Sequence, residues 1–245
     1  MNKLLLLLLL LTLSLSASVH ITKLQYEGGI SIFGKVGTGT ITIKEDLDKQ
    51  TYFIEAKTSS SGIVKVLSAN RQYIYRSEGI IHNGRYVPKK FEEIMTKKHY
   101  KEKTSYLFDY KKQKVLKRSS KQELVTRHYF DAMKLKIMSK KELEKKHEQK
   151  YVQLVPNDYL SLFLNFSAHK LQVGKVTYVD QKKSTTLKLL NPTTFEVSKE
   201  NGDKVYRIKI YEKGSKYFQK AVALDIAFYG DAYVKKIFEK SFSTK

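Results

Sequence analysis

Residues 26–46 read YEGGISIFGKVGTGTITIKED, and this stretch decides the fold class. It has the composition of β-strands, yet it contains five glycines: Gly28, Gly29, Gly34, Gly37 and Gly39. Glycines in such a pattern either form a phosphate-binding loop between a strand and a helix, or allow a β-sheet to bend. A second β-like run follows these glycines, with Ile41 and Ile43 alternating with polar residues. The sequence therefore favours a bent sheet over a phosphate loop.

The alternation changes phase within this stretch. Tyr26 and Val36 occupy even positions, whereas Ile41 and Ile43 occupy odd ones. A slip of one residue would move every side chain to the other face of the sheet, so the chain must absorb the change with a β-bulge or a tight reversal. We assign this structural role to three glycines: Gly34, Gly37 and Gly39.

Alternating runs separated by turn residues continue along most of the chain and predict a mainly β, antiparallel fold. Hairpin turns are expected at Asn83-Gly84, Lys111-Lys112, Asn201-Gly202 and Gly230-Asp231. Two segments read instead as short helices. Residues 139–150, SKKELEKKHEQK, offer Ser139 and Glu142 as a capping box, and residues 157–174 carry Leu160, Phe163 and Leu164 at helical spacing before a stop at Gly174.

The N-terminus reads as a secretory signal peptide. A lysine precedes an apolar run, Leu4–Leu15, which is shorter than the roughly 20 residues of a membrane-spanning helix. Ser16 and Ser18 predict cleavage before Val19, which leaves residues 19–245 as a single domain in the periplasm. The chain has no cysteine, so disulfides, thiol catalysis and lipid attachment to cysteine are excluded. We expect no transmembrane segment after cleavage.

The formal net charge is +22, carried by 46 basic and 24 acidic residues. Lysine dominates over the six arginines, and lysine is the less specific ligand for phosphate, so we expect no nucleic-acid partner. A compositional bias of the lineage explains the excess equally well. The charge is densest in residues 109–118, DYKKQKVLKR. We predict that this hairpin contacts an anionic surface through Lys111, Lys112, Lys114, Lys117 and Arg118.

Candidate catalytic groups are scarce. The six histidines have no carboxylates at metal-ligand spacing, and the adjacent Glu92 and Glu93 should point to opposite faces of a strand. Asp158 and Ser161 resemble a nucleophile pair only superficially, because an Asp at this position caps the following helix. We therefore predict no catalytic, cofactor-binding or metal-binding residues and no cofactor, and we assign Asp158 and Ser161 a structural role.

Several short motifs resemble an exported bacterial β-protein family that is grouped as a domain of unknown function. They are Tyr26, Ile30 and Gly34; Thr58 and Gly62; Tyr73, Ser77 and Gly79; Pro88 and Phe91; YLFDYKKQKV; Asp158 and Ser161; and the closing VALDIAFYGDAYVKKIFE. The charged segment 139–150 is longer than the family usually has. The resemblance implies a curved antiparallel sheet forming a partly open barrel, similar in outline to periplasmic lipoprotein carriers, and it implies no known activity.

We expect a non-enzymatic periplasmic protein whose concave sheet binds an amphiphile, with an anionic lipid, lipopolysaccharide or another envelope component as partner. The alternative is a cell-envelope scaffold whose barrel is filled by its own side chains. A polysaccharide-acting enzyme is disfavoured because it lacks a carboxylate pair. An apolar cavity of ~300 Å³ or more would separate the first two interpretations. The oligomeric state stays open.

Overall fold

Fourteen strands form one antiparallel sheet around a single helix in the part of the chain that the computed structural model describes. The described residues are 19–32, 34–61, 70–131, 133–134, 136–179, 184–197, 206–212, 214–224 and 231–244. The predicted signal peptide, residues 1–18, lies outside them, as do the turns expected at Asn201-Gly202 and at Gly230.

The first eight strands form a meander in which each strand pairs with the next. They are β1 (Val19–Ile30), β2 (Gly34–Asp46), β3 (Thr51–Ser60), β4 (Gln72–His82), β5 (Arg85–Lys97), β6 (Tyr100–Asp109), β7 (Lys114–Asp131) and β8 (Lys136–Gln153). A second meander follows the helix α3 (Tyr159–Ser167), and its last strand returns to pair with β1. It contains β9 (Gly174–Val179), β10 (Ser184–Asn191), β11 (Thr194–Val197), β12 (Tyr206–Tyr211), β13 (Lys220–Leu224) and β14 (Ala232–Thr244).

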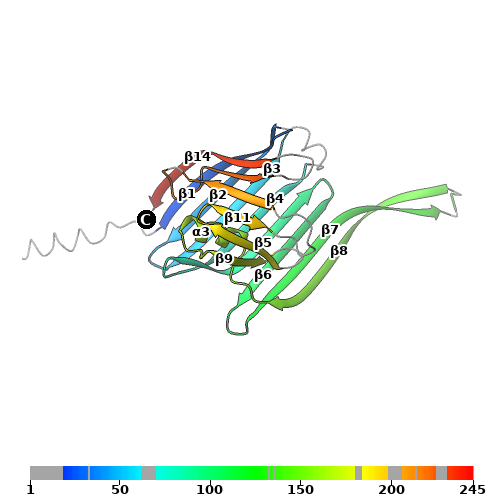
Figure 1. Ribbon diagram of the computed structural model, residues 1–245. Helices are drawn as coiled ribbons and strands as arrows, with labels where there is room; N and C mark the ends of the chain where they lie inside the picture. Colours follow the sequence, from blue (N-terminus) through cyan, green and yellow to red (C-terminus); the bar gives the residue numbers. More distant parts are fainter. Residues whose placement is uncertain are drawn as a thin grey trace, which may run out of the picture.

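The sheet curves strongly but does not close. Its strand order runs from β8 through β1 and β14 to β9, so β8 and β9 are the two edges. Figure 1 shows the second meander folded over the first, with α3 between them. The predicted fold class, a curved antiparallel sheet that forms a partly open barrel, is confirmed.

The core occupies both sides of α3. On one side, Leu160 and Leu164 pack against the inner faces of the first meander, including Ile54 and Phe91. On the other side, Leu162 and Phe166 pack in a cluster with residues of the second meander: Val176, Tyr178, Leu189, Phe195 and Ile210. The helix is therefore apolar on both flanks and holds the two halves of the sheet together.

The helix begins as predicted. Asp158 is its N-cap and accepts hydrogen bonds from the backbone N–H groups of Leu160 and Ser161. The predicted stop at Gly174 is wrong, because the helix already ends at Ser167. His169 adopts a positive φ of 53°, and the backbone N–H of Lys170 donates to the Asn165 carbonyl, which turns the chain out of the helix.

The second predicted helix, residues 139–150, is also wrong. This segment belongs to β8, which pairs with β7 over 18 residues. The long ladder with β7 favours the strand, and Arg127 adds to it, since its guanidinium contacts both Glu142 (3.2 Å) and Glu144 (2.6 Å) on the neighbouring strand. Residues two apart share one face of a strand but not of a helix. Cross-strand pairing thus overrides the helical propensity of lysine and glutamate.

Candidate functional site: an apolar pocket beneath the glycine-rich strands

A pocket of about 490 Å³ opens between the inner face of β1–β4 and two phenylalanines. Phe163 comes from α3, and Phe218 comes from the segment before β13. The other lining residues are Tyr26, Gly28, Val36, Gly37, Thr38, Gly39, Thr40, Ile41, Ala56, Lys57, Thr58, Ser59, Ser60, Arg71, Tyr73 and Val234. Most of the lining surface is therefore apolar or backbone.

The space arises because the inward residues of β2 change from isoleucine to glycine toward one end of the strand, beside small residues on β3. In the middle of the strands, one row across the sheet consists of Thr22, Ile43 and Ile54, and the next of Leu24, Ile41 and Ala56. Nearer the end, the rows become Tyr26, Gly39 and Thr58, and then Gly28, Gly37 and Ser60. The same sheet surface thus changes from a filled core to an open pocket.

The predicted structural glycines lie where this taper occurs. Gly34 begins β2 with a φ of 64°, directly after the reversal from β1. Val36 is an extra residue in the ladder, because Gly28 pairs with Gly37 and Gly29 pairs with Lys35. A Cβ on Gly37 would lie 2.5 Å from the Ser59 carbonyl oxygen. The sequence predicted a bulge or a reversal, and the structure has both. Gly37 and Gly39 also line the pocket, which sequence reasoning missed.

Aromatic contacts hold the floor of the pocket in place. The Tyr26 hydroxyl donates to the Phe218 carbonyl at 3.1 Å, and the two rings lie 5.1 Å apart. Phe163 stacks on Tyr217 and meets Phe218 edge-on, each with centroids 5.7 Å apart. These rings come from distant parts of the chain, so no local sequence signal could have grouped them.

Polar anchors fix the helix that carries Phe163. The Asn165 side chain accepts from the Tyr86 backbone N–H (2.8 Å) and donates to the Tyr86 carbonyl (2.9 Å), which joins α3 to β5. Asp158 is fully buried and also accepts a hydrogen bond from Ser77 at 2.7 Å. Burial raises the pKa of the Asp158 carboxyl to about 6, although its hydrogen bonds oppose this shift.

The capping interpretation of Asp158 and Ser161 is confirmed. The Ser161 hydroxyl accepts a hydrogen bond from the Asp158 backbone N–H at 2.9 Å, so the two residues form a capping box. Both side chains are buried, and both are committed to capping the start of the helix. They lie outside the set of residues that line the pocket.

Two cations occur among the lining residues that the structure describes, Lys57 and Arg71. The Lys57 ammonium lies 2.7 Å from Glu55, with which it shares the outer face of β3. The Arg71 guanidinium is exposed and donates to the Tyr73 hydroxyl at 3.3 Å. Since Tyr73 pairs with Thr58 on the inner face, Arg71 is the better placed of the two to reach a group at the pocket mouth.

A buried polar cluster elsewhere in the barrel was not predicted. Glu45 accepts a hydrogen bond from the Tyr86 hydroxyl, and the Lys216 ammonium lies 3.2 Å from both side chains. Burial, followed by the hydrogen bond to Glu45, raises the pKa of Tyr86. The sequence signal for it is that Glu45 continues the inward series of Ile41 and Ile43. The cluster joins β2, β5 and the segment before β13.

The basic hairpin lies at the end of β7 that is remote from the β7–β8 turn, and its five cations have different surroundings. Lys111 and Lys112 are in the turn, and Lys112 lies 3.8 Å from Asp109. Lys117 lies over the Tyr106 ring, 5.6 Å from its centroid. Lys114 and Arg118 share the opposite face of the strand, where Arg118 donates to Gln149. The structure does not gather them into one surface.

The adjacent glutamates of β5 point to opposite faces of the strand, as predicted. Glu92 pairs with Lys90 and Lys103, while Glu93 follows Phe91 toward the buried face. Among the described residues, no group of three or more His, Asp and Glu side chains is placed to hold a metal ion. Across the same residues, none of the helical structure has the length and hydropathy required to cross a bilayer.

Comparison with known proteins gives a family but no activity. No curated protein matches the chain. A solved structure that resembles it is the β-barrel-like protein of domain of unknown function DUF1849 from Brucella abortus, with 10% sequence identity and a TM-score of 0.39 over 93% of this chain and 99% of that one. The family model for proteins of unknown function DUF3108 matches residues 19–236. Because that match spans most of the sequence, the chain belongs to the DUF3108 family.

Proposed function

We propose that this protein is an exported, non-enzymatic binding protein that holds the apolar part of an amphiphile in the pocket beneath β1–β4. The observation that carries the proposal is the inward taper from Ile41 to Gly39 and Gly37, which leaves about 490 Å³ open at one end of an otherwise packed interior. This volume falls within the range of roughly 300–1,000 Å³ that is typical of small-molecule sites.

The chemistry of the lining supports an apolar ligand. Phe163, Phe218, Val234 and Ile41 would supply contact with a hydrocarbon chain, and each methylene removed from water contributes about 0.8 kcal/mol. Val234 is 38% exposed, so the pocket presents a large apolar side chain that a ligand would cover. Arg71 at the mouth would pair with an anionic head group. An anionic lipid, lipopolysaccharide or another amphiphilic envelope component has this combination.

The lining favours binding over turnover. The described lining residues include no carboxylate and no histidine, which are the groups that most often transfer protons in catalysis. The periplasm is the proposed compartment, on the strength of the signal-like sequence of residues 1–18. The scaffold alternative keeps some support, because Tyr52, Tyr86, Phe91 and Tyr106 fill the interior away from the pocket.

A pocket-filling substitution tests the proposal. A Cβ on Gly39 would lie 3.7 Å from its nearest neighbour, an ordinary contact, so Gly39→Val should fold while its side chain occupies the pocket. Gly39→Val should bind a fluorescent long-chain fatty acid about tenfold or more weakly than wild type, because the valine side chain fills apolar volume that the fatty acid would occupy. Thr42→Val, on the outer face of the same strand, is the matched control. Equal binding by wild type and Gly39→Val would remove the pocket from consideration.

A further inference from the structure

The outer parts of β7 and β8 form an arm that extends beyond the barrel. The ladder between β6 and β7 ends where Tyr100 pairs with Glu123. From Leu124 to Asp131, β8 is the only strand that pairs with β7 among the described residues, opposite Lys136 to Leu143, and the Leu124 backbone N–H donates to the His99 carbonyl at the base of the arm. Eight residues at 3.3–3.4 Å each give an arm about 25 Å long. Figure 1 shows this two-stranded ribbon projecting away from the rest of the sheet.

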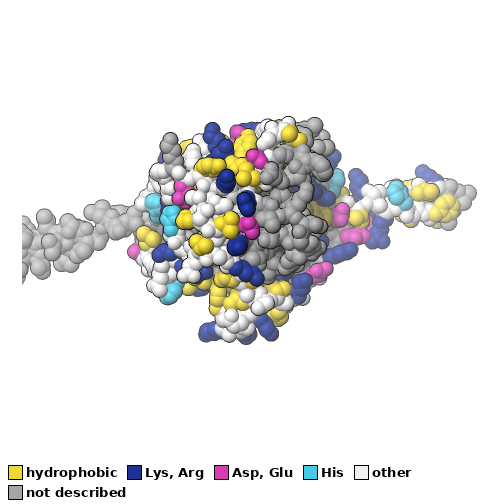
Figure 2. Space-filling model, in the orientation of Figure 1, with side chains coloured by type: hydrophobic (Ala, Val, Ile, Leu, Met, Phe, Trp, Pro, Cys, Tyr) yellow, Lys and Arg dark blue, Asp and Glu magenta, His cyan; other side chains and the backbone are white. Residues whose placement is uncertain are grey.

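The end of the arm is apolar and exposed. Phe130 and Ile137 face one another across the ladder, and they are 62% and 73% exposed. Met133 in the connecting turn is 97% exposed. We call these three side chains the arm tip. Figure 2 shows hydrophobic side chains gathered at the far end of the arm, with basic side chains beside them.

The arm tip makes no contribution to the packed core, since its residues belong to neither buried cluster of the described chain. A two-stranded ribbon is only marginally stable in water. Leaving large apolar side chains exposed at its end costs free energy, and packing within the two core clusters does not offset this cost. Exposed apolar groups that project from a folded body mark surfaces that bind a partner or a membrane.

Basic side chains surround the arm tip. Residues 124–143 contain five basic and two acidic side chains, a net charge of +3. The basic residues are Arg127, Lys134, Lys136, Lys140 and Lys141, and all are exposed. An apolar end with a basic collar complements an anionic bilayer, in which the apolar groups enter the acyl boundary and the lysines meet the head groups.

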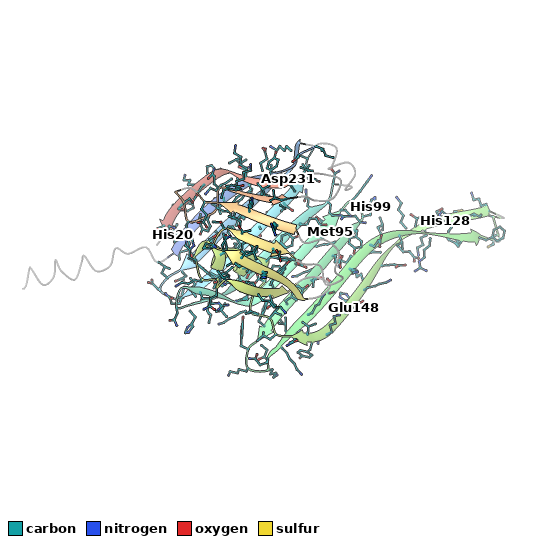
Figure 3. All side chains as sticks on the ribbon, in the orientation of Figure 1. His20, Met95, His99, His128, Glu148 and Asp231 are labelled. Atoms are coloured by element: carbon teal, nitrogen blue, oxygen red, sulfur yellow. The ribbon has the colours of Figure 1, made fainter. Side chains whose placement is uncertain are left out.

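Contacts between its two strands brace the arm, so that it can present its end. Arg127 is held between Glu142 and Glu144, and the Ser139 hydroxyl lies 2.9 Å from the His128 ring. Figure 3 places His128 in the outer half of the arm and Glu148 near its base. These contacts involve the two strands only, so the ribbon depends on cross-strand pairs rather than on the barrel.

We propose that the arm tip, Phe130 with Met133 and Ile137, inserts into the surface of an anionic phospholipid bilayer and docks the barrel there. The charge of the collar and the lack of any described segment that covers the tip both support this occupant. The inference does not depend on the pocket: the barrel can dock whether or not it binds an amphiphile.

The chain contains no tryptophan, which permits a site-specific test. Phe130→Trp places a single fluorophore at the arm tip, and Leu47→Trp places one at a 54% exposed position in the β2–β3 turn. The protein used is the chain from Val19 to Lys245, which contains the whole described fold. It is mixed with vesicles of phosphatidylglycerol and phosphatidylcholine, or of phosphatidylcholine alone, at low and high salt.

The emission of Phe130→Trp should shift to the blue with anionic vesicles, more strongly at low salt, and that of Leu47→Trp should not. In flotation assays, the double variant Phe130→Ser/Ile137→Ser should bind these vesicles at least about tenfold more weakly than wild type, whereas Leu47→Ser should bind equally well. Vesicle binding without a shift at position 130 would overturn the proposal. A shift that depends on protein concentration and needs no vesicles would also overturn it, in favour of contact between two copies.

Discussion

Tyr26 lies directly across the β1–β2 ladder from Gly39, and its hydroxyl donates to the Phe218 carbonyl at 3.1 Å. The missing side chain of Gly39 therefore faces a space that the Tyr26 ring limits but does not fill. Beyond this pair, Gly28 faces Gly37, so two successive rows of the inner sheet surface lack bulk on β2. This arrangement opens a pocket at one end of a packed barrel.

Gly34 should affect stability through its backbone conformation alone. Gly34 has a φ of 64°, and no heavy atom lies within 4 Å of where its Cβ would be. Gly34→Val should lower the free energy of unfolding by about 1–2 kcal/mol, because a β-branched residue is strained in the left-handed region. Gly34→Asn should lower the free energy of unfolding by less, since asparagine tolerates the left-handed region. Denaturant melts measure both variants. Equal losses of stability would mean that strain in the left-handed region does not set the cost.

Asp158 should make stability depend on pH. Its pKa is raised from 3.8 to about 6 by burial, so the folded state holds the proton more tightly than the unfolded state does. The stabilisation from this group is complete below its ordinary pKa and is lost as the pH rises through about 6. The two pKa values imply a loss of about 3 kcal/mol between about pH 4 and about pH 7.

Asp158→Asn keeps an acceptor for the backbone N–H groups of Leu160 and Ser161 but cannot titrate. Subtracting its urea midpoints from those of wild type across this pH range isolates the Asp158 contribution. The stability of Asp158→Asn relative to wild type should increase as the pH rises. A constant difference, or one of opposite sign, would show that the carboxyl is not destabilised when charged.

Different parts of the first meander differ in how far the sequence predicts them. The hairpins around Asn83-Gly84 and Lys111-Lys112 were predictable because turn residues separate alternating runs, and local chemistry decides such turns. Residues 139–150 misled the prediction because lysine and glutamate favour a helix in isolation, whereas the strand is held by partners such as Arg127 on β7. Long-range pairing of that kind leaves no local pattern.

The pocket was not predictable for a related reason. The sequence shows Gly28, Gly37, Gly39 and Thr58 as separate small residues, and only the register of β1, β2 and β3 brings them to one end of one face. Phe163 and Phe218 complete the site from positions 55 residues apart, and their contact depends on how α3 packs. The bend was predictable from glycine, but the cavity that the bend encloses was not.

The basic hairpin, residues 109–118, is an alternative to the arm tip as the site that contacts an anionic membrane. The sequence predicts Lys111, Lys112 and Lys114 as part of the main anionic contact. If the arm tip is the anchor instead, Lys111/Lys112/Lys114→Gln should weaken co-sedimentation with anionic vesicles by no more than about threefold, because the hairpin lies at the opposite end of β7, beyond a Debye length from the docked bilayer. Three lysines held at the membrane would contribute about 1 kcal/mol each, and their loss would weaken binding by roughly a hundredfold. Loss of binding in this triple variant, with none in Phe130→Ser/Ile137→Ser, would restore the hairpin as the anchor.

If the protein is exported, removal of the signal peptide should leave a defined N-terminus. Strand β1 begins at Val19, whose partner in the ladder is Thr244 on β14. Ser16 and Ser18 predict cleavage before Val19, within two residues. Terminal sequencing of protein from the envelope of its own host should find this new terminus. Envelope protein that retains Met1 would contradict cleavage and would indicate an uncleaved N-terminal anchor.

The central claim is that the pocket beneath β1–β4 holds an amphiphile. Native mass spectrometry of wild type and Gly39→Val, both purified without detergent from their own host, tests it most directly. Wild type should carry an additional mass that denaturation releases, and Gly39→Val should carry much less of it, while Thr42→Val should match wild type. Ligand-free wild type, or equal occupancy in wild type and Gly39→Val, would contradict the claim and leave the barrel as a scaffold.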